Sequence, residues 1–268
     1  MLTSVSFIGG GNMATAMIAG LRRLAAPPQV CVAEPDPEKR ARFAAQGILA
    51  TAENTQAVAA GAVVVLAVKP QVMAAVLPEI AAAWTPGTLL VSILAGTTTA
   101  RLESLLPAGA AVVRAMPNTP LAIGQGMVGL CPGAHARAEH LALAEALFAP
   151  CGKVLRVADE SRMDAITAVS GSGPAYVFQV AEHLVTAAMG LGFDRAEAEL
   201  LVGQTLSGSV AYLMQQGIAS AGELRRAVTS PGGTTAAALA ELERSGMGEA
   251  WIRALAAARA RGAELAKA

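Results

Sequence analysis

The chain is 268 residues long, 54% hydrophobic and only 3% aromatic, and its twenty basic residues are balanced by twenty acidic ones. Because it has no basic tract to neutralise phosphates and few rings to stack on bases, we expect a small-molecule partner, with no nucleic acid and no membrane. The length allows two domains of ordinary size, and three cysteines without metal-ligand spacing indicate a reducing compartment, so a cytoplasmic location is expected.

Short apolar runs alternate with helical patterns through the first part of the chain. The runs predict strands at residues 5–8, 30–33, 63–68, 89–93 and 111–114. Apolar residues at helical spacing predict helices at residues 12–24, 37–46, 71–83, 98–105 and 135–148. This alternation is typical of a parallel, doubly wound α/β sheet. We therefore expect residues 1–157 to form a Rossmann-like domain.

The remainder of the chain, residues 158–268, contains no convincing strand. Long apolar patterns predict helices at residues 174–190, 194–216 and 248–266. The second of these carries Leu200, Val202, Leu206 and Val210 around much of its circumference, which is more apolar surface than one buried face requires. We expect an all-α dimerisation domain in which a second subunit covers the surplus.

Uncharged segments do not indicate membrane insertion or export. The stretches 80–100 and 115–136 are interrupted by prolines, so neither is a credible membrane span. The uncharged first 21 residues lack a basic start and contain Gly-Gly-Gly-Asn, which favours strand, loop and helix over a signal peptide. The three histidines do not cluster as metal ligands, so no metal is expected.

A glycine loop joins the first predicted strand to the first predicted helix. It comprises Ile8, Gly9, Gly10, Gly11, Asn12, Met13 and Ala14. In a βαβ unit the first glycine permits a tight turn, the second lets backbone approach a pyrophosphate, and a third small residue allows close helix packing. Gly9, Gly11 and Ala14 fit that order, and the helix start can receive the diphosphate. The alternative is an ordinary glycine turn without a ligand.

Glu34 ends the second predicted strand, where dinucleotide folds place an acid that binds the adenosine ribose 2′-hydroxyl. This position favours NADH. However, Lys39, Arg40, Arg22 and Arg23 could approach a 2′-phosphate, and Glu34 could equally be a solvated strand-end acid. The expected cofactor is therefore NADPH or NADH.

Five sequence motifs in order resemble the pyrroline-5-carboxylate reductase family across nearly the whole chain. They are Ile8 to Ala14, Val68-Lys69-Pro70, Met116-Pro117-Asn118-Thr119-Pro120, Ser170-Gly171-Ser172-Gly173-Pro174-Ala175-Tyr176 and Ser230-Pro231-Gly232-Gly233-Thr234-Thr235. The last two are more specific than the glycine loop, which many Rossmann enzymes share.

The resemblance implies the last step of proline biosynthesis, in which NAD(P)H reduces the C=N bond of L-1-pyrroline-5-carboxylate to L-proline. It also implies a homodimer interlocked through the helical domain, which often assembles into a larger ring. The substrate site of this family forms between one subunit's cofactor domain and helices of its partner.

The substrate carboxylate needs hydrogen-bond donors, and Ser230, Gly232, Gly233, Thr234 and Thr235 precede a predicted helix at residues 236–243. Glycines let several N–H groups converge on an anion, and the helix adds its positive end. The alternative is a plain Ser or Thr helix cap. By resemblance, Thr235 is the catalytic candidate, with its hydroxyl facing the ring nitrogen.

Other candidate site residues have weaker support. Val68, Lys69 and Pro70 end a strand at the carboxyl edge of the sheet, where ligands bind, although Lys69 could be a solvated charge. By resemblance, further cofactor contacts are Asn54, Ala95, Gly96 and Asn118, and further substrate contacts are Glu160, Ser172 and Gly173.

Two other functions compete with imine reduction. A hydroxyacid dehydrogenase with the same layout would need a lysine or acid near the carbonyl, and none is evident in residues 170–176. A protonated imine becomes neutral on receiving hydride, so it needs no such acid. A noncatalytic dinucleotide-binding protein is the other alternative, and it would bind cofactor without turnover.

Overall fold

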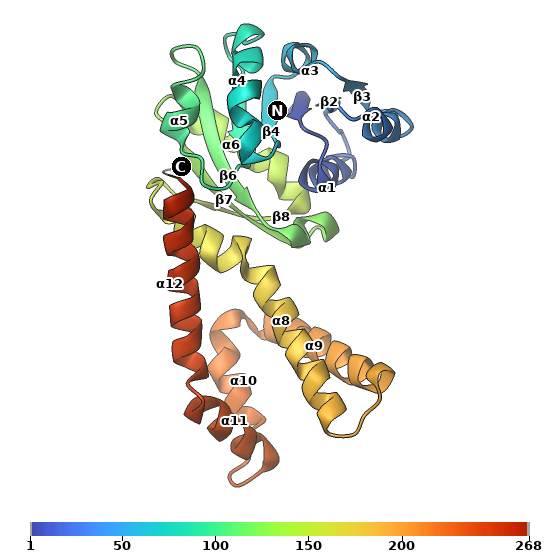
Figure 1. The fold of residues 1–268 in the computed structure, drawn as a ribbon, viewed down its shortest axis with the longest axis vertical. Helices are drawn as coiled ribbons and strands as arrows, with labels where there is room; N and C mark the ends of the chain where they lie inside the picture. Colours follow the sequence, from blue (N-terminus) through green and yellow to red (C-terminus); the bar gives the residue numbers. More distant parts are fainter. Residues whose placement is uncertain (1, 267–268) are drawn as a thin grey trace. The chain divides into compact units, whose positions relative to one another are not determined.

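The computed structural model describes residues 2–266, which form two compact units. One unit comprises Met1–Pro174 and Ala257–Ala268, and the other comprises Ala175–Ala256. The first contains a single sheet with its helices, and the second is built from helices (Figure 1). The domain boundary predicted after residue 157 falls between the last strand and the next helix, and it stays a prediction.

The sheet has eight strands in the order β3-β2-β1-β4-β5-β6-β7-β8. They are β1 (Ser4–Ile8), β2 (Gln29–Ala33), β3 (Leu49–Thr51), β4 (Val63–Leu66), β5 (Leu89–Ser92), β6 (Ala111–Pro117), β7 (Gly126–Pro132) and β8 (Gly152–Arg156). All neighbours are parallel except β6 and β7, which are antiparallel. The strand order reverses at β1, which lies between β2 and β4. In open α/β sheets, ligands bind at the carboxyl ends of the strands beside such a reversal.

Helices cover both faces of this sheet because its central strands are apolar on both sides. One core lies under α1 (Asn12–Leu21), α2 (Pro37–Ala44) and α6 (Ala138–Phe148). The other lies under α3 (Asn54–Ala60), α4 (Met73–Ala82) and α5 (Thr99–Glu103). In β4, Val63 and Val65 pack into the first core and Val64 and Leu66 into the second. All four are fully buried, which explains a run without a polar residue.

The five predicted strands are confirmed, but β3, β7, β8 and helix α3 are not predicted from the sequence. β3 has only three residues, and β7 contains Gly126 and Gly129, residues that are depleted in strands. A Cβ at Gly129 would lie 2.8 Å from Ile166 Cγ2, so close packing against the helix that follows β8 explains this glycine. The predicted parallel, doubly wound sheet is confirmed, with one antiparallel pair, β6–β7.

Short helical turns connect these elements. Turns of 3-10 helix are η1 (Pro70–Val72), η2 (Thr119–Ile123) and η3 (Ala149–Cys151). After β8, α7 (Arg162–Ile166) and a π-helical turn, η4 (Thr167–Gly171), lead to α8. The sheet unit thus ends in a change of helical type just before the chain enters the second unit.

The helical part of the chain agrees with the prediction, and the described residues after 157 contain no strand. Its elements are α8 (Gly173–Gly190), α9 (Arg195–Gln216), η5 (Ile218–Ser220), α10 (Ala221–Ala227), α11 (Thr234–Arg244) and α12 (Met247–Leu265). Asp194 begins α9, since its carboxylate accepts from Glu197 N at 2.9 Å while the Glu197 carboxylate accepts from Asp194 N at 2.9 Å. Among residues 2–266, no helix has the length and apolarity that crossing a membrane requires.

Apolar side chains project from the helical unit. On α9, Leu200 is 73% exposed, Val210 54% and Met214 64%. Exposed apolar side chains that gather on one helix are typical of a protein–protein interface. This surface accords with the expectation that a second subunit covers α9.

Candidate functional site

The glycine loop is a tight turn between β1 and α1. Gly9 has φ +99°, a conformation that strains any residue with a Cβ, and its N–H donates to Ala33 O at 2.8 Å. A Cβ here would lie 2.7 Å from Ala67 O. A Cβ at Gly10 would lie 2.5 Å from Phe43 Cε2. Backbone geometry and packing therefore require the first two glycines.

Gly11 differs, because a Cβ there would meet nothing within 4 Å. Gly11 is the N-cap of α1, and no side chain caps the helix, so the first N–H groups of α1 have no side-chain acceptor. Ala14 is fully buried against the core, as the third small residue of the pattern should be. Open space in front of uncapped N–H groups is what a pyrophosphate requires.

Glu34 is anchored within this loop rather than solvated. It is only 6% exposed, its Oε2 accepts from Gly10 N at 2.9 Å, and its Oε1 accepts from Asp36 N at 3.1 Å. The alternative of a solvated strand-end acid is therefore wrong. Glu34 joins the end of β2 to the glycine loop and so fixes the loop's shape.

The four candidate cations are not equivalent. Arg40 donates to Glu34 O at 2.7 Å and Pro35 O at 2.6 Å, so its guanidinium lies at the end of β2. Arg22 and Arg23 follow the far end of α1, about 15 Å along the helix from the glycine loop. Arg23 donates instead to Pro150 O at 3.2 Å. The suggestion that Arg22 and Arg23 approach a 2′-phosphate is wrong, and Lys39 and Arg40 remain.

Two further predicted segments lie at the same carboxyl edge. After β4, Val68 packs near Gly9, since its Cγ1 would be 3.2 Å from a Cβ there, and Lys69 is exposed. After β5, Ala95 and Gly96 form a turn in which Gly96 has φ +69°. Pro70, Ala95 and Gly96 line one cavity of about 670 Å³, together with Leu265 of α12. The structure thus brings the ends of β4 and β5 around a common hollow.

The two predicted asparagines hold secondary structure elements together. Asn54 starts α3 and donates to Glu79 Oε2 of α4 at 2.9 Å. Asn118, at the end of β6, donates to Ser170 O at 3.0 Å and accepts from Met127 N at 2.8 Å. Asn118 is 9% exposed, and these bonds tie β6 to β7 and to the π-helical turn.

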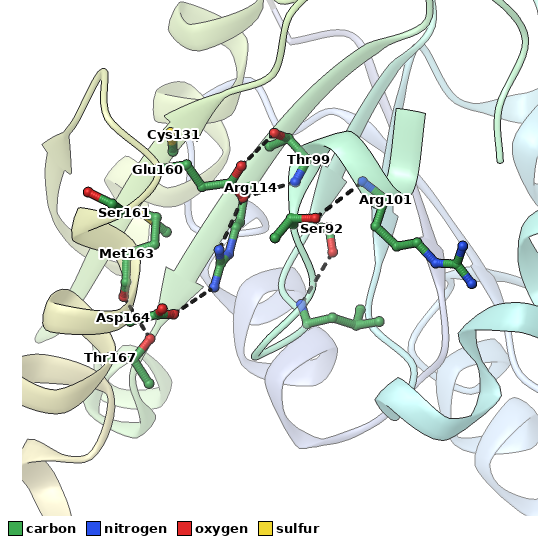
Figure 2. Close-up of polar contacts among 12 residues, drawn as sticks. Ser92, Thr99, Arg101, Arg114, Cys131, Glu160, Ser161, Met163, Asp164 and Thr167 are labelled. Atoms are coloured by element: carbon green, nitrogen blue, oxygen red, sulfur yellow. Dashed lines mark hydrogen bonds and ion pairs between the residues drawn. The ribbon is translucent and has the colours of Figure 1, made fainter. Parts of the chain in front are cut away.

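Glu160 is the centre of a charged cluster in the sheet unit, which Figure 2 shows. Its Oε1 accepts from Arg114 Nη1 at 3.0 Å and from Thr99 N at 2.9 Å, and its Oε2 accepts from Thr99 Oγ1 at 2.7 Å. Arg114 Nη2 also pairs with Asp164 Oδ1 at 3.4 Å. Burial raises the pKa of the nearby Cys131 thiol to about 11, and the negative charge of Glu160 adds to this rise. Both carboxylate oxygens of Glu160 are engaged within the protein.

Ser172 and Gly173 lie where the π-helical turn passes into α8. The Ser172 N–H donates to Thr167 O at 2.8 Å, which completes that turn. A Cβ at Gly173 would meet nothing within 4 Å. Gly171 is different, because a Cβ there would lie 2.6 Å from Met116 Cε. A side chain at Gly171 would therefore displace the end of Met116 on β6, whereas Gly173 faces open space.

The predicted carboxylate segment lies in the helical unit. Gly232 has φ +70°, and Gly233 is the N-cap of α11, with no side chain capping the helix. The alternative of a Ser or Thr helix cap is wrong, because the N-cap residue is a glycine. Thr234 and Thr235 form the first turn of α11, and Thr235 is partly exposed. Ser230 O accepts from Gly233 N at 3.1 Å and closes the turn.

Sequence analysis does not identify Arg114, Thr99 or Asp164 as members of the cluster. Arg114 carries a signal that could have been used, because it is a charge inside the apolar run of β6. A buried arginine requires anionic partners, and its side chain is 3% exposed. Among residues 2–266, no three or more His, Cys, Asp or Glu side chains are arranged to hold a metal ion.

Two family models match the chain. Residues 4–96 match the model described as NADP oxidoreductase coenzyme F420-dependent, and residues 160–265 match pyrroline-5-carboxylate reductase dimerisation. The first match contains the glycine loop and the turn at Gly96, and the second contains Glu160 and the Ser230–Thr235 segment.

Relatives match over nearly the full length. The chain is 43% identical to a pyrroline-5-carboxylate reductase of Pseudomonas aeruginosa, covering 98% of this chain and 97% of that protein. It is 38% identical to the enzyme of Haemophilus influenzae, covering 97% of each. The solved structure of a Coxiella burnetii pyrroline-5-carboxylate reductase has 38% identity and a TM-score of 0.92, covering 100% of both chains. A Plasmodium falciparum structure with NADP bound has 27% identity and a TM-score of 0.87, covering 98% of each.

Proposed function

The chain belongs to the pyrroline-5-carboxylate reductase family, and on that premise we propose that it reduces the C=N bond of L-1-pyrroline-5-carboxylate to give L-proline, the last step of proline biosynthesis. The observation that supports the reaction most is the match to pyrroline-5-carboxylate reductases over nearly the full length, and the glycine loop supports binding of the cofactor. The turn of this loop is fixed by Gly9 and Glu34, and open space at Gly11 faces the uncapped start of α1. The site residues below are part of the same proposal.

Bound NAD(P)H supplies the hydride, and the residues of the sheet unit hold it. Uncapped N–H groups at Asn12 and Met13 receive the pyrophosphate, and the helix dipole adds favourable charge. The ends of β4 and β5, at Lys69 and Gly96, flank the nicotinamide half of the cofactor. Val68, Pro70, Ala95 and Asn118 belong to the same half, and Asn54 lies at the β3 end.

Glu34 has a second role in this proposal, as the acceptor for the adenosine ribose 2′-hydroxyl. Each carboxylate oxygen has two acceptor positions, so the bonds from Gly10 N and Asp36 N leave capacity for a third donor. Lys39 is exposed beside the same strand end and is the cation available to a 2′-phosphate. The ratio of kcat/KM for NADH and NADPH measures which arrangement dominates.

Residues Ser230–Thr235 bind the substrate carboxylate in this proposal. The uncapped N–H groups of α11 offer donors, and Gly232 and Gly233 let the backbone bend toward an anion. The Thr235 hydroxyl can donate to or accept from the ring nitrogen. Ser172 and Gly173 contribute backbone near the reacting carbon, where Gly173 leaves open space.

The active form is a homodimer joined through the helical domain. The dimerisation family model matches residues 160–265, and apolar side chains of α9 are exposed in one chain. We also propose that dimers associate into a larger ring and that the protein is cytoplasmic. The boundary between its two domains is proposed to lie after residue 157. Light scattering tests the ring, because a single dimer mass contradicts it.

Oxidation of NADH and NADPH is the direct test. The full-length protein is mixed with each cofactor and either pyrroline-5-carboxylate or a 2-keto acid, and loss of the reduced cofactor is followed by absorbance. We expect turnover of the imine only. Absence of imine turnover with both cofactors contradicts the proposed function, and cofactor binding without turnover favours a noncatalytic protein.

A further inference from the structure

The turn formed by Ala95, Gly96, Thr97 and Thr98 is fixed from two sides. Before it, Ser92 Oγ accepts from Leu94 N at 3.3 Å. After it, both the N–H and the hydroxyl of Thr99 donate to the Glu160 carboxylate, at 2.9 and 2.7 Å. Thr99 is 6% exposed, so water does not substitute readily for these bonds. A residue 61 positions away in sequence therefore sets where the turn ends.

Arg114 holds Glu160 in place from within the sheet. Its guanidinium is buried and forms ion pairs with Glu160 at 3.0 Å and with Asp164 at 3.4 Å. Figure 2 shows the arginine reaching from its strand to both carboxylates, with Thr99 on the other side of Glu160. A forked guanidinium can orient two carboxylates at once, which a lysine ammonium does less well.

The bonds of Glu160 tie its carboxylate mainly to the protein, because three of its four acceptor positions are occupied. Oε1 already has two donors and Oε2 has one, and all three come from Thr99 and Arg114. Its side chain is 25% exposed. Its effect on the reaction is then transmitted through Thr99 to the turn at Gly96.

We propose that Glu160, oriented by Arg114, is a positioning residue that holds the turn from Ala95 to Thr98 in the geometry that binds the nicotinamide half of the cofactor. The proposal rests on the proposed function in one respect, the assignment of that turn to the cofactor. It adds a role for Glu160 other than contact with the substrate.

The test compares matched threonine variants of the full-length protein. Thr99→Val removes the hydroxyl at nearly constant volume, and Thr99→Ser keeps it. The control is Thr88→Val, which removes a similarly buried hydroxyl bonded to Thr85 Oγ1 at 2.9 Å, before β5 begins and away from the turn. Glu160→Gln is a second variant that weakens the same bonds from the other partner.

Kd for NADPH and NADH is measured by calorimetry without substrate, and KM for the imine is measured at saturating cofactor.

We expect Thr99→Val and Glu160→Gln to raise the Kd of reduced cofactor about tenfold, the effect of losing one hydrogen bond to a charged group. Thr99→Ser and Thr88→Val should stay close to the parent protein in Kd. Hydrogen exchange of the peptide containing Thr99 should become faster in Thr99→Val and Glu160→Gln, but not in Thr99→Ser or Thr88→Val. The KM for the imine should change less than the Kd of the cofactor.

Three results would overturn the proposal. They are an unchanged cofactor Kd in both Thr99→Val and Glu160→Gln, an equal change in Thr88→Val, or a raised imine KM with unchanged cofactor Kd in Glu160→Gln. Because Kd is measured without substrate, a parent protein that binds cofactor but does not reduce the imine fails only the proposed function. A parent protein that binds neither cofactor overturns both proposals.

Discussion

Replacing Glu34 with alanine tests the anchoring of the glycine loop. The carboxylate accepts two backbone hydrogen bonds, from Gly10 N at 2.9 Å and Asp36 N at 3.1 Å. Hydrogen bonds to charged groups contribute about 1.5–3 kcal/mol each. The bond to Asp36 is only partly buried, so water replaces part of it. We expect Glu34→Ala to lower the free energy of unfolding by about 2–4 kcal/mol.

The same variant should weaken both cofactors, because Gly10 N loses its acceptor and the loop is no longer held in one shape. An additional loss for NADH over NADPH would measure the proposed bond to the ribose 2′-hydroxyl. Glu34→Gln is the closest variant, since its amide oxygen can still accept from Gly10 N while its NH₂ group cannot accept from Asp36 N. It should lie between the parent protein and Glu34→Ala.

Urea denaturation at fixed protein concentration measures the stability change, because oligomers unfold at concentrations of urea that depend on protein concentration. Fluorescence titration measures the Kd of each cofactor. Glu38→Ala serves as a control, since Glu38 is an exposed acid on the first turn of α2. A stability change below about 0.5 kcal/mol in Glu34→Ala would refute the anchoring role. Equal losses for NADH and NADPH would refute the ribose contact alone.

Three other predictions concern the loop, the substrate segment and the thiols. Gly9→Ala should lower the free energy of unfolding by about 2 kcal/mol or more, because φ is +99° and a Cβ would clash with Ala67 O. Gly11→Ala should change the free energy of unfolding by less than about 1 kcal/mol yet weaken cofactor binding. Urea denaturation measures both variants, and equal stabilities would contradict this prediction. Thr235→Ala should lower kcat more than it changes cofactor Kd, and unchanged kcat in steady-state assays removes Thr235 from the mechanism. The pKa of the Cys131 thiol is raised from 9.0 to about 11, so its contribution to stability is complete below pH 9 and is lost as the pH rises toward 11. Rapid labelling of Cys131 in the native protein by a thiol reagent at pH 8 would contradict this burial.

The sequence predicts the parts of the fold that depend on local pattern. β4 is a continuous apolar run because both of its faces are covered, and the glycine loop has its strand and helix on either side. β7 is missed because its glycines resemble a turn, and close packing explains them, of Gly126 against Leu121 and of Gly129 against Ile166. The contact with Ile166 joins residues far apart in sequence, so no local pattern contains it.

The candidate site also has residues that the local sequence identifies and contacts that only the fold creates. The position of Glu34 at a strand end is readable from the sequence, but its bond to Gly10 depends on the spacing of β1 and β2 in the sheet. Glu160 depends even more on contacts that no local sequence pattern contains. The sequence points to Glu160 only through the family resemblance, and its partners Thr99 and Arg114 are brought to it by β5, β6 and the turn before α7.

The path of the chain between its two units affects how the protein is made. The sheet unit begins at Met1 but includes Ala257–Ala268, so the helical unit is inserted into it in topological terms. During synthesis N-terminal segments emerge first, and domains generally fold as units. Until the helical unit has been synthesised, the sheet unit therefore lacks its last segment, and Gly96 lacks its neighbour Leu265. Nascent chains stalled before residue 257 should resist protease less well in this unit than released ones.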